Sequence, residues 1–129
     1  MVRRSPSARP DNDRGAALVE FALLLPLLLL LVFGVIEFGR GYHTKTTLTH
    51  AAREGVRVAA LDSGDPAATV RTAAPNLDAG SIDVTVSPSP CIAGQPVTVT
   101  VEYDHDYDIP LFGSGTWSFE EEGVMRCGG

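Results

Sequence analysis

AALVEFALLLPLLLLLVFGVI, at residues 16–36, is the stretch of this chain that decides the fold. Glu20 is its single ionisable residue, and leucine is its commonest side chain. At about 1.5 Å per helical residue, the stretch would reach roughly 31 Å, which matches the thickness of the hydrocarbon core of a bilayer. Residues 16–36 are therefore predicted to form a transmembrane helix.

Two other interpretations of this stretch are weaker. A cleaved secretory signal peptide would have a shorter apolar region followed by a small-residue cleavage site, whereas Glu37, Phe38 and Gly39 follow here. A buried helix of a globular core would confine its apolar residues to one stripe, whereas these leucines cover every face. Pro26 removes one backbone donor and can kink the helix, but transmembrane helices tolerate proline.

Glu20 is the unusual residue of the span. A carboxylate inside hydrocarbon costs about 2.5–3.5 kcal/mol on insertion scales, so Glu20 needs a partner, access to the headgroups or a function. Gly15 lies five positions before it, with four apolar residues between them, and Phe21 follows it. This pattern resembles the type III signal sequence of type IV pilins and pseudopilins. There, a prepilin peptidase cuts after the glycine, which would make Ala16 the first mature residue and Glu20 the fifth.

The resemblance continues through residues 14–61, RGAALVEFALLLPLLLLLVFGVIEFGRGYHTKTTLTHAAREGVRVAAL. The VEFA motif, the proline in the leucine run and AAREG resemble the TadE-like pseudopilins of Tad (Flp) pilus systems. The resemblance implies subunit packing through Glu20 and Pro26, with Glu20 pairing with the Ala16 amine of a neighbouring subunit. Such a pair would offset part of the cost of placing each charge in lipid. The implied partners are a prepilin peptidase, the Tad membrane platform, pilin subunits and the lipid bilayer.

Charge divides the chain into three parts. Residues 1–15 have a net charge of +2, residues 16–61 of +1 and residues 62–129 of −9. The first part, a basic leader, is expected to be disordered and removed by the peptidase. Its arginines favour a cytoplasmic N-terminus, although basic residues also follow the span. The acidic remainder would then be a small domain outside the cytoplasm, and its charge makes nucleic acid an unlikely partner.

The two cysteines support this orientation. Cys91 and Cys127 both lie in the acidic domain, and they do not form a C-x-x-C pair. This usage fits one disulfide in an oxidising compartment. If the last two predicted strands pair in opposite directions, both cysteines fall at the same end of the sheet. The alternative is two free buried thiols.

The remaining sequence predicts a pilin-like, membrane-anchored α+β fold. The helix is expected to continue over residues 37–61 as an amphipathic extension, with Gly39 and Gly41 making the junction bendable. A short second helix should begin at Pro66, capped by Asp65. A small antiparallel sheet of about three strands should pack on the long helix. The apolar face expected on the extension consists of Phe38, Tyr42, Leu48, Ala52, Val56, Ala59 and Ala60.

Alternation of apolar and polar residues predicts the strands. The first covers residues 82–87, the second covers residues 97–103, and the third begins at Trp117 and continues to Arg126. Gly123 is expected to mark a bulge in the third strand.

Clusters of polar residues give weak signals for chemistry. Residues 104–108, Asp-His-Asp-Tyr-Asp, lack the spacing of a calcium loop and are interpreted as a solvated loop between strands. Residues 120–122, three glutamates, are expected on an exposed face or turn. His43 and His50 are seven residues apart on the predicted helix, without an evident third metal ligand. No metal site, cofactor or catalytic motif is predicted, so we do not expect an enzyme.

These features favour a TadE-like minor pseudopilin or pilus-assembly protein that acts through helix packing in the membrane. A single-pass, membrane-anchored binding module unrelated to pili is the main alternative. A third interpretation, a small membrane enzyme, would require an activity that depends on residues 104–108. The N-terminus of the mature protein separates the first two, because only the pseudopilin would begin at Ala16.

Overall fold

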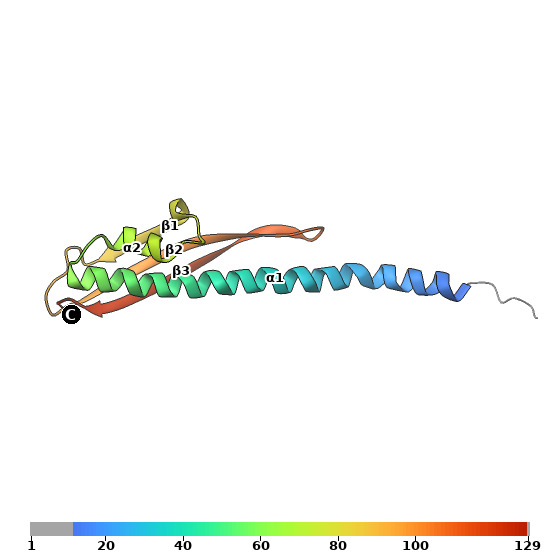
Figure 1. The fold of residues 1–129 in the computed structure, drawn as a ribbon, viewed down its shortest axis with the longest axis horizontal. Helices are drawn as coiled ribbons and strands as arrows, with labels where there is room; N and C mark the ends of the chain where they lie inside the picture. Colours follow the sequence, from blue (N-terminus) through green and yellow to red (C-terminus); the bar gives the residue numbers. More distant parts are fainter. Residues whose placement is uncertain (1–11, 129) are drawn as a thin grey trace, which may run out of the picture.

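The first helix, α1 (Asn12–Leu61), runs almost the whole length of the molecule in the computed structural model, which describes residues 12–128 (Figure 1). Most of the predicted leader, residues 1–11, lies outside the described residues. Its last part, residues 12–15, was expected to be disordered but forms the first turn of α1. Asp13 lies in that turn, where a carboxylate stabilises the amino end of a helix dipole.

The predicted continuation of the helix beyond the apolar span is confirmed. α1 has 50 residues and passes without interruption through Pro26, Gly39 and Gly41. A helix of this length extends for about 75 Å at 1.5 Å per residue. The bendable junction expected at the two glycines does not interrupt it. The helix therefore forms one rod from the apolar span to the sheet.

The buried face of α1 differs from the predicted one near the membrane end. Leu48, Ala52, Val56, Ala59 and Ala60 are buried as expected, but Phe38 and Tyr42 are 68% and 65% exposed. Three residues with small or polar side chains take the inner positions instead: Glu37, Gly41 and Thr44. The reason is that the sheet places the large side chain of Trp117 over this part of the helix, where it leaves room for a residue as small as Gly41.

The second helix, α2 (Pro66–Ala73), confirms the predicted cap. Asp65 accepts a hydrogen bond from the backbone N–H of Ala67 at 2.9 Å, and Pro66 occupies the first helical position. Val70, on the buried side of α2, packs against Gly55 of α1, where a β-carbon would lie 2.5 Å from a Val70 methyl group. α2 therefore rests directly on the backbone of α1.

A short 3₁₀ helix, η1 (Ala79–Ser81), leads into the sheet. The Ser81 hydroxyl and the Gly80 backbone N–H both donate to the Asp78 carboxylate, and these hydrogen bonds lower the pKa of Asp78.

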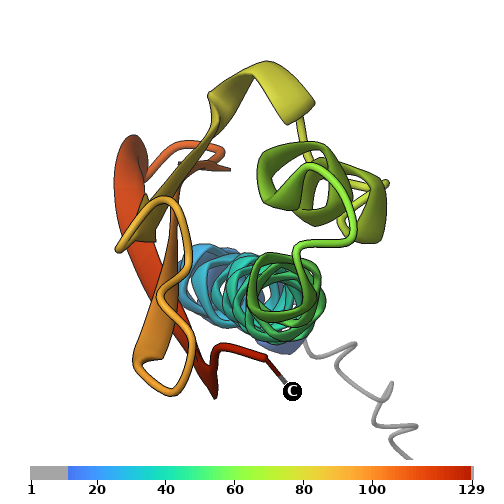
Figure 2. The ribbon, with the colours of Figure 1, turned by 90° about the vertical axis from the view of Figure 1, so that its left-hand side faces the viewer.

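Three antiparallel strands form the sheet, in the order β1-β2-β3. They are β1 (Ile82–Ser87), β2 (Pro96–Ile109) and β3 (Gly113–Arg126). The sheet lies on one side of α1, while α2 occupies another side, as the view along α1 shows (Figure 2). The predicted fold class is confirmed: a long apolar N-terminal helix, a second short helix and a three-stranded antiparallel sheet.

Two details of the sheet correct the sequence predictions. Residues 104–108 are not a loop, because β2 continues through them to Ile109, paired with β3. Gly123 is not in a bulge, because the pairing is regular on both sides of it. A β-carbon at Gly123 would lie 2.6 Å from the carbonyl oxygen of Ala52, so glycine is needed for the close approach of β3 to α1.

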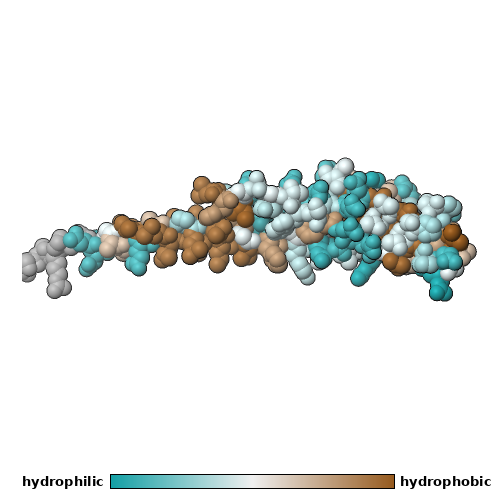
Figure 3. Space-filling view, turned by 180° about the vertical axis from the view of Figure 1, so that it is seen from behind, coloured by the Kyte–Doolittle hydropathy of each residue, from teal (hydrophilic) through white to brown (hydrophobic). Residues whose placement is uncertain are grey.

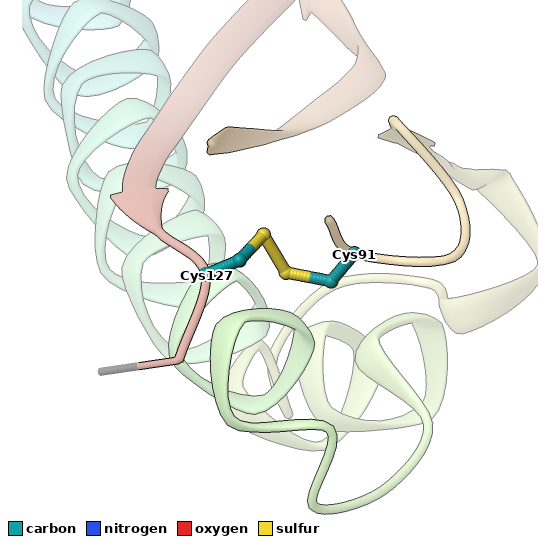
Figure 4. The surroundings of a disulfide bond; sticks show 2 residues. All are labelled: Cys91 and Cys127. Carbon is teal, nitrogen blue, oxygen red and sulfur yellow. A yellow bond between two sulfur atoms is a disulfide. The ribbon is translucent and has the colours of Figure 1, made fainter. Parts of the chain in front are cut away.

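The core lies between the outer half of α1, α2 and the sheet, and a disulfide closes its far end. Val97, Val99 and Val101 of β2 are fully buried against Leu48 and the alanines of α1. Cys91 and Cys127 are bonded, as predicted, at the end of the sheet opposite the apolar span (Figure 4). The described residues include no free cysteine.

Candidate functional site

The first part of the candidate site is the bare apolar half of α1. Among the described residues, α1 is the one helix long and apolar enough to cross a membrane, and none of its most apolar window is buried by the rest of the protein. Leu23 is 75% exposed, and neighbouring side chains on every face are also exposed. On the face that Figure 3 shows, the surface of this half is mostly apolar. A surface of this extent requires lipid or other apolar segments around it.

The predicted processing residues lie at the beginning of this surface. Gly15, Ala16, Glu20 and Phe21 are all exposed residues of the first turns of α1. Among residues 12–128, no basic side chain forms an ion pair with Glu20, since the described ion pairs are those of Glu37 and Glu121. Within residues 12–128, no other helix or strand covers the processing residues. Any function that they have requires another molecule.

Pro26 lies within the helix and is exposed. Because proline lacks an N–H group, the carbonyl of Ala22, four residues earlier, has no intrahelical donor there. The apolar half thus contains two hydrogen-bond acceptors that are close together along the chain: the carboxylate of Glu20 and the carbonyl of Ala22. Both can accept a hydrogen bond from a neighbouring segment in the membrane.

The second part of the site is the contact between α1 and the β2–β3 hairpin, just beyond the apolar span. Trp117 of β3 lies over Gly41, where a β-carbon would be 2.6 Å from the indole ring. Tyr107 of β2 packs against Trp117 with ring centroids 5.0 Å apart. The Thr44 hydroxyl lies 3.4 Å from Nδ1 of His105. The aromatic side chains occupy the space that a larger residue at position 41 would need.

Polar groups are also enclosed at this contact. Glu37 is buried, and its carboxylate accepts a hydrogen bond from the guanidinium of Arg40, which is exposed, at 3.1 Å. Nε2 of His105 is buried without a hydrogen-bond partner among the described residues. Farther from the span, Glu121 accepts a hydrogen bond from Thr49 at 3.1 Å and lies 3.8 Å from Lys45. The contacts of Glu121 with Thr49 and Lys45 join β3 to α1.

A groove lies beside this contact. It has a volume of about 540 Å³ and runs between α1 and β3 at the level where the apolar span ends. Its walls are mostly apolar, and Lys45 is at its polar end. The residues that line it are Phe38, Gly41, Tyr42, Lys45, Thr116, Trp117, Ser118 and Phe119.

The hairpin contact was not predicted, because the second strand was expected to end at Tyr103 whereas β2 continues to Ile109. The alternation of Tyr103, His105, Tyr107 and Ile109 has the period of a strand and could have revealed the continuation. In the structure, these residues are partly buried, whereas the aspartates at 104, 106 and 108 are exposed on the other face. Asp104 accepts a hydrogen bond from Ser118, and Asp106 accepts one from Thr116.

The described side chains do not form a metal site. Residues 12–128 contain no group of three or more histidine, cysteine, aspartate or glutamate side chains that could hold a metal ion. His43 and His50 are exposed on α1, as expected for surface residues. The glutamates at 120–122 lie within β3 rather than in a turn, and Glu120 and Glu122 are on its exposed face, which was the other expected position.

The part of the chain that holds the apolar half and its glutamate matches a known family model. Residues 15–57 match the TadE-like protein family. The TadE-like segment covers about a third of the chain, from the glycine of the predicted processing site to the part of α1 that packs on the sheet. The match confirms the resemblance noted in the sequence and supports a protein associated with Tad pili. No curated protein and no solved structure matches the chain.

The TadE-like segment ends within α1, before α2 and the sheet begin. It contains the residues that carry the apolar surface and also the α1 side of the hairpin contact. The family match therefore describes the rod, and the structure adds the domain that packs on its outer half.

Proposed function

We propose that this chain is a minor pseudopilin or pilus-assembly protein of a bacterial Tad (Flp) system. A prepilin peptidase removes the leader after Gly15, and the mature chain begins at Ala16. The observation that carries the proposal is the apolar half of α1, which is exposed on every face and contains one carboxylate, Glu20, without a partner among the described residues. The match of residues 15–57 to the TadE-like family supports it.

In this proposal, the span anchors the protein once in the membrane, with the N-terminus in the cytoplasm and the sheet domain outside. The disulfide between Cys91 and Cys127 supports this orientation, because disulfides persist in oxidising compartments. The net charge of −9 on residues 62–129 supports a role without nucleic acid. The protein is a substrate of the peptidase and not itself an enzyme.

Packing in the membrane then depends on Glu20 and Pro26. The new amine of Ala16 is a cation, and the Glu20 carboxylate of a neighbouring subunit or of the membrane platform can pair with it, which reduces the cost of both charges in lipid. Pro26 leaves the Ala22 carbonyl available to a second donor. Pilin subunits and the Tad membrane platform are the proposed neighbours.

The test is the N-terminal mass of the protein purified from membranes, with and without the peptidase. The proposal expects a chain that begins at Ala16 only when the peptidase is present, and an unprocessed chain for a variant in which Gly15 is replaced by a bulky residue. An intact leader in the presence of active peptidase would instead identify a permanently anchored binding module.

A second experiment separates processing from packing. Glu20→Gln removes the charge while keeping the size of the side chain, and it is expected to reduce pilus assembly. Glu54→Gln, which changes a partly exposed glutamate on the outer half of α1, is the matched control and should not reduce it. Unchanged assembly with Glu20→Gln would contradict the proposed pairing.

A further inference from the structure

The turn between β2 and β3 exposes large apolar side chains at the end of the hairpin that points toward the apolar half of α1 (Figure 1). We call residues 109–112, Ile-Pro-Leu-Phe, the hairpin tip. Leu111 is 90% exposed and Phe112 is 45% exposed. The tip lies beyond the contact of Trp117 with Gly41 and that of Tyr107 with Trp117, and the Leu111 side chain is almost fully exposed among the described residues.

The register of β3 along α1 gives the position of the tip along the helix axis, which we call its level. Gly123 lies against Ala52, and Trp117 lies against Gly41, so six residues of β3 run beside eleven residues of α1. At about 3.3 Å per strand residue and 1.5 Å per helical residue, these lengths are about 20 Å and 17 Å, so β3 runs nearly along the helix axis. At the same ratio, the four residues from Trp117 to Gly113 descend by about 11 Å, to roughly the level of Gly34.

This level is inside the predicted membrane span, which ends at Ile36. The tip residues beyond Gly113 therefore lie a few ångströms below the boundary of the hydrocarbon, at the level of the apolar half of α1. The space-filling view agrees, because an apolar projection stands beside the apolar part of the rod at this level (Figure 3).

The backbone of the tip is suited to an apolar environment. Pro110 has no N–H group, and the N–H of Phe112 donates to the carbonyl of Ile109 at 3.0 Å. Within residues 110–112, only the N–H of Leu111 remains as a donor. Unpaired backbone N–H and C=O groups are costly in lipid, so a turn with few unpaired donors can enter only the shallow part of a leaflet, where its carbonyls stay close to the headgroups.

Leu111 also has an unusual conformation. Its φ angle is 71°, in the left-handed region, where glycine or asparagine would be the favoured residue of a solvated turn. The chain instead has a leucine there and exposes it. A strained apolar residue at an exposed tip indicates that its side chain serves a contact outside the folded domain.

We infer that the hairpin tip inserts into the outer leaflet of the membrane, so that the protein has a second membrane contact beside its span. The inference depends on the membrane span of the proposed function. Asp108 limits the depth, because its exposed carboxylate directly precedes the tip and must stay at the headgroups. Phe38 and Tyr42 on α1 are both exposed, and they lie about 6 Å and about 12 Å beyond the level of Gly34 along the helix. There they add interfacial aromatic side chains.

Insertion of the tip would fix how the sheet domain is oriented on the membrane. A single helix leaves the domain free to rotate about the span and to tilt, whereas two contacts on one side define a direction. The acidic outer face of the hairpin, with Asp104 and Asp106, would then face away from the rod at a defined angle above the lipid.

Fluorescence of single labelled cysteines tests this inference in the full chain, since both native cysteines are in the disulfide. The three variants are Leu111→Cys at the tip, Glu120→Cys on the exposed face of the same hairpin and Leu28→Cys in the span. Each carries an environment-sensitive nitrobenzoxadiazole label and is placed at one copy per nanodisc of phosphatidylcholine and phosphatidylglycerol.

At position 111, we expect blue-shifted emission and at least twofold stronger quenching by lipids with a shallow nitroxide than by lipids with a deep one. Position 120 should be quenched by aqueous iodide, and position 28 by the deep nitroxide. If iodide quenches the label at position 111 as strongly as the label at position 120, while the label at position 28 is in lipid, the insertion of the tip is refuted but the membrane span is not. Iodide quenching at position 28 as well would overturn the membrane span of the proposed function.

A label-free measurement covers the possibility that the label itself drives insertion. Trp117 is the single tryptophan of the chain and lies just above the tip. Brominated lipids should quench its emission, and Leu111→Asp should reduce this quenching at least twofold, whereas Glu120→Asp should not. Equal quenching of Trp117 in the unmodified protein, Leu111→Asp and Glu120→Asp would refute lipid insertion. In the labelling experiment, protection of the label at position 111 from iodide only when several copies share a nanodisc would also refute it, because another copy would then cover the tip.

Discussion

Two glycines of α1, two residues apart, give a matched pair for testing how the hairpin docks on the rod. A β-carbon at Gly39 would meet nothing within 4 Å, whereas one at Gly41 would lie 2.6 Å and 2.8 Å from two atoms of the Trp117 indole. Replacing either glycine with alanine reduces the conformational entropy of the unfolded chain and improves helix propensity. Gly39→Ala is therefore expected to stabilise the protein by about 0.5–1 kcal/mol.

Gly41→Ala gains the same propensity but forces Trp117 to move. Overpacking of this kind costs about 1–3 kcal/mol, so the net effect should lie between no change and a loss of about 2 kcal/mol. The informative quantity is the difference between the two variants, about 1–3 kcal/mol. For a folded region of this size, 1 kcal/mol corresponds to a shift in Tm of about 4–8 °C.

The assay is thermal or urea unfolding of the full chain in detergent micelles, followed by the fluorescence of Trp117, which is the single tryptophan. Hydrogen exchange of the β2–β3 amides should show faster exchange near Trp117 in Gly41→Ala than in Gly39→Ala. Equal stability and equal exchange in the two variants would refute the close contact between the indole and the helix backbone.

Three further changes test other contacts of the fold. Gly123→Ala places a β-carbon 2.6 Å from the Ala52 carbonyl, and since that atom belongs to the backbone, we expect a loss of stability of about 1–3 kcal/mol in urea unfolding; a gain in stability would contradict the close packing. Replacing both Cys91 and Cys127 with serine opens a bridge of sequence separation 36, which should lower the free energy of unfolding by about 3–4 kcal/mol in the chain-entropy model; an unchanged denaturation midpoint would show that the bridge is dispensable. Asp65→Ala removes the cap of α2 and should cost about 1 kcal/mol, whereas Asp65→Asn should cost less; equal losses would show that the hydrogen bond to the Ala67 N–H is not the source of the stability, since asparagine can also accept it.

The parts of the fold that depend on local pattern could be predicted from the sequence. The unbroken apolar run predicted a long helix, Asp65 and Pro66 marked the start of α2, and alternation marked the strands. The pairing of Cys91 with Cys127 followed from the antiparallel order of the last two strands. These signals are properties of single segments or of neighbouring ones.

The contact between the hairpin and α1 could not be predicted in the same way. Asp104 and Asp106 made a strand look like a solvated loop, although they occupy only its outer face. Phe38 and Tyr42 have the right spacing for a packed helix face, yet Gly41 is buried there because Trp117 needs its space. Which residue is buried depends on side chains that arrive from a strand more than sixty residues later in the chain.

The membrane span at residues 16–36 is tested by extraction and protease protection of membranes that contain the full chain. The protein should stay in the membrane pellet in alkaline carbonate, and protease added from outside the cytoplasm should digest residues 62–129 while protecting a fragment that contains residues 16–36. Release of the intact chain into the carbonate supernatant as a monomer without detergent would contradict the span, and with it the proposed function and the insertion of the hairpin tip.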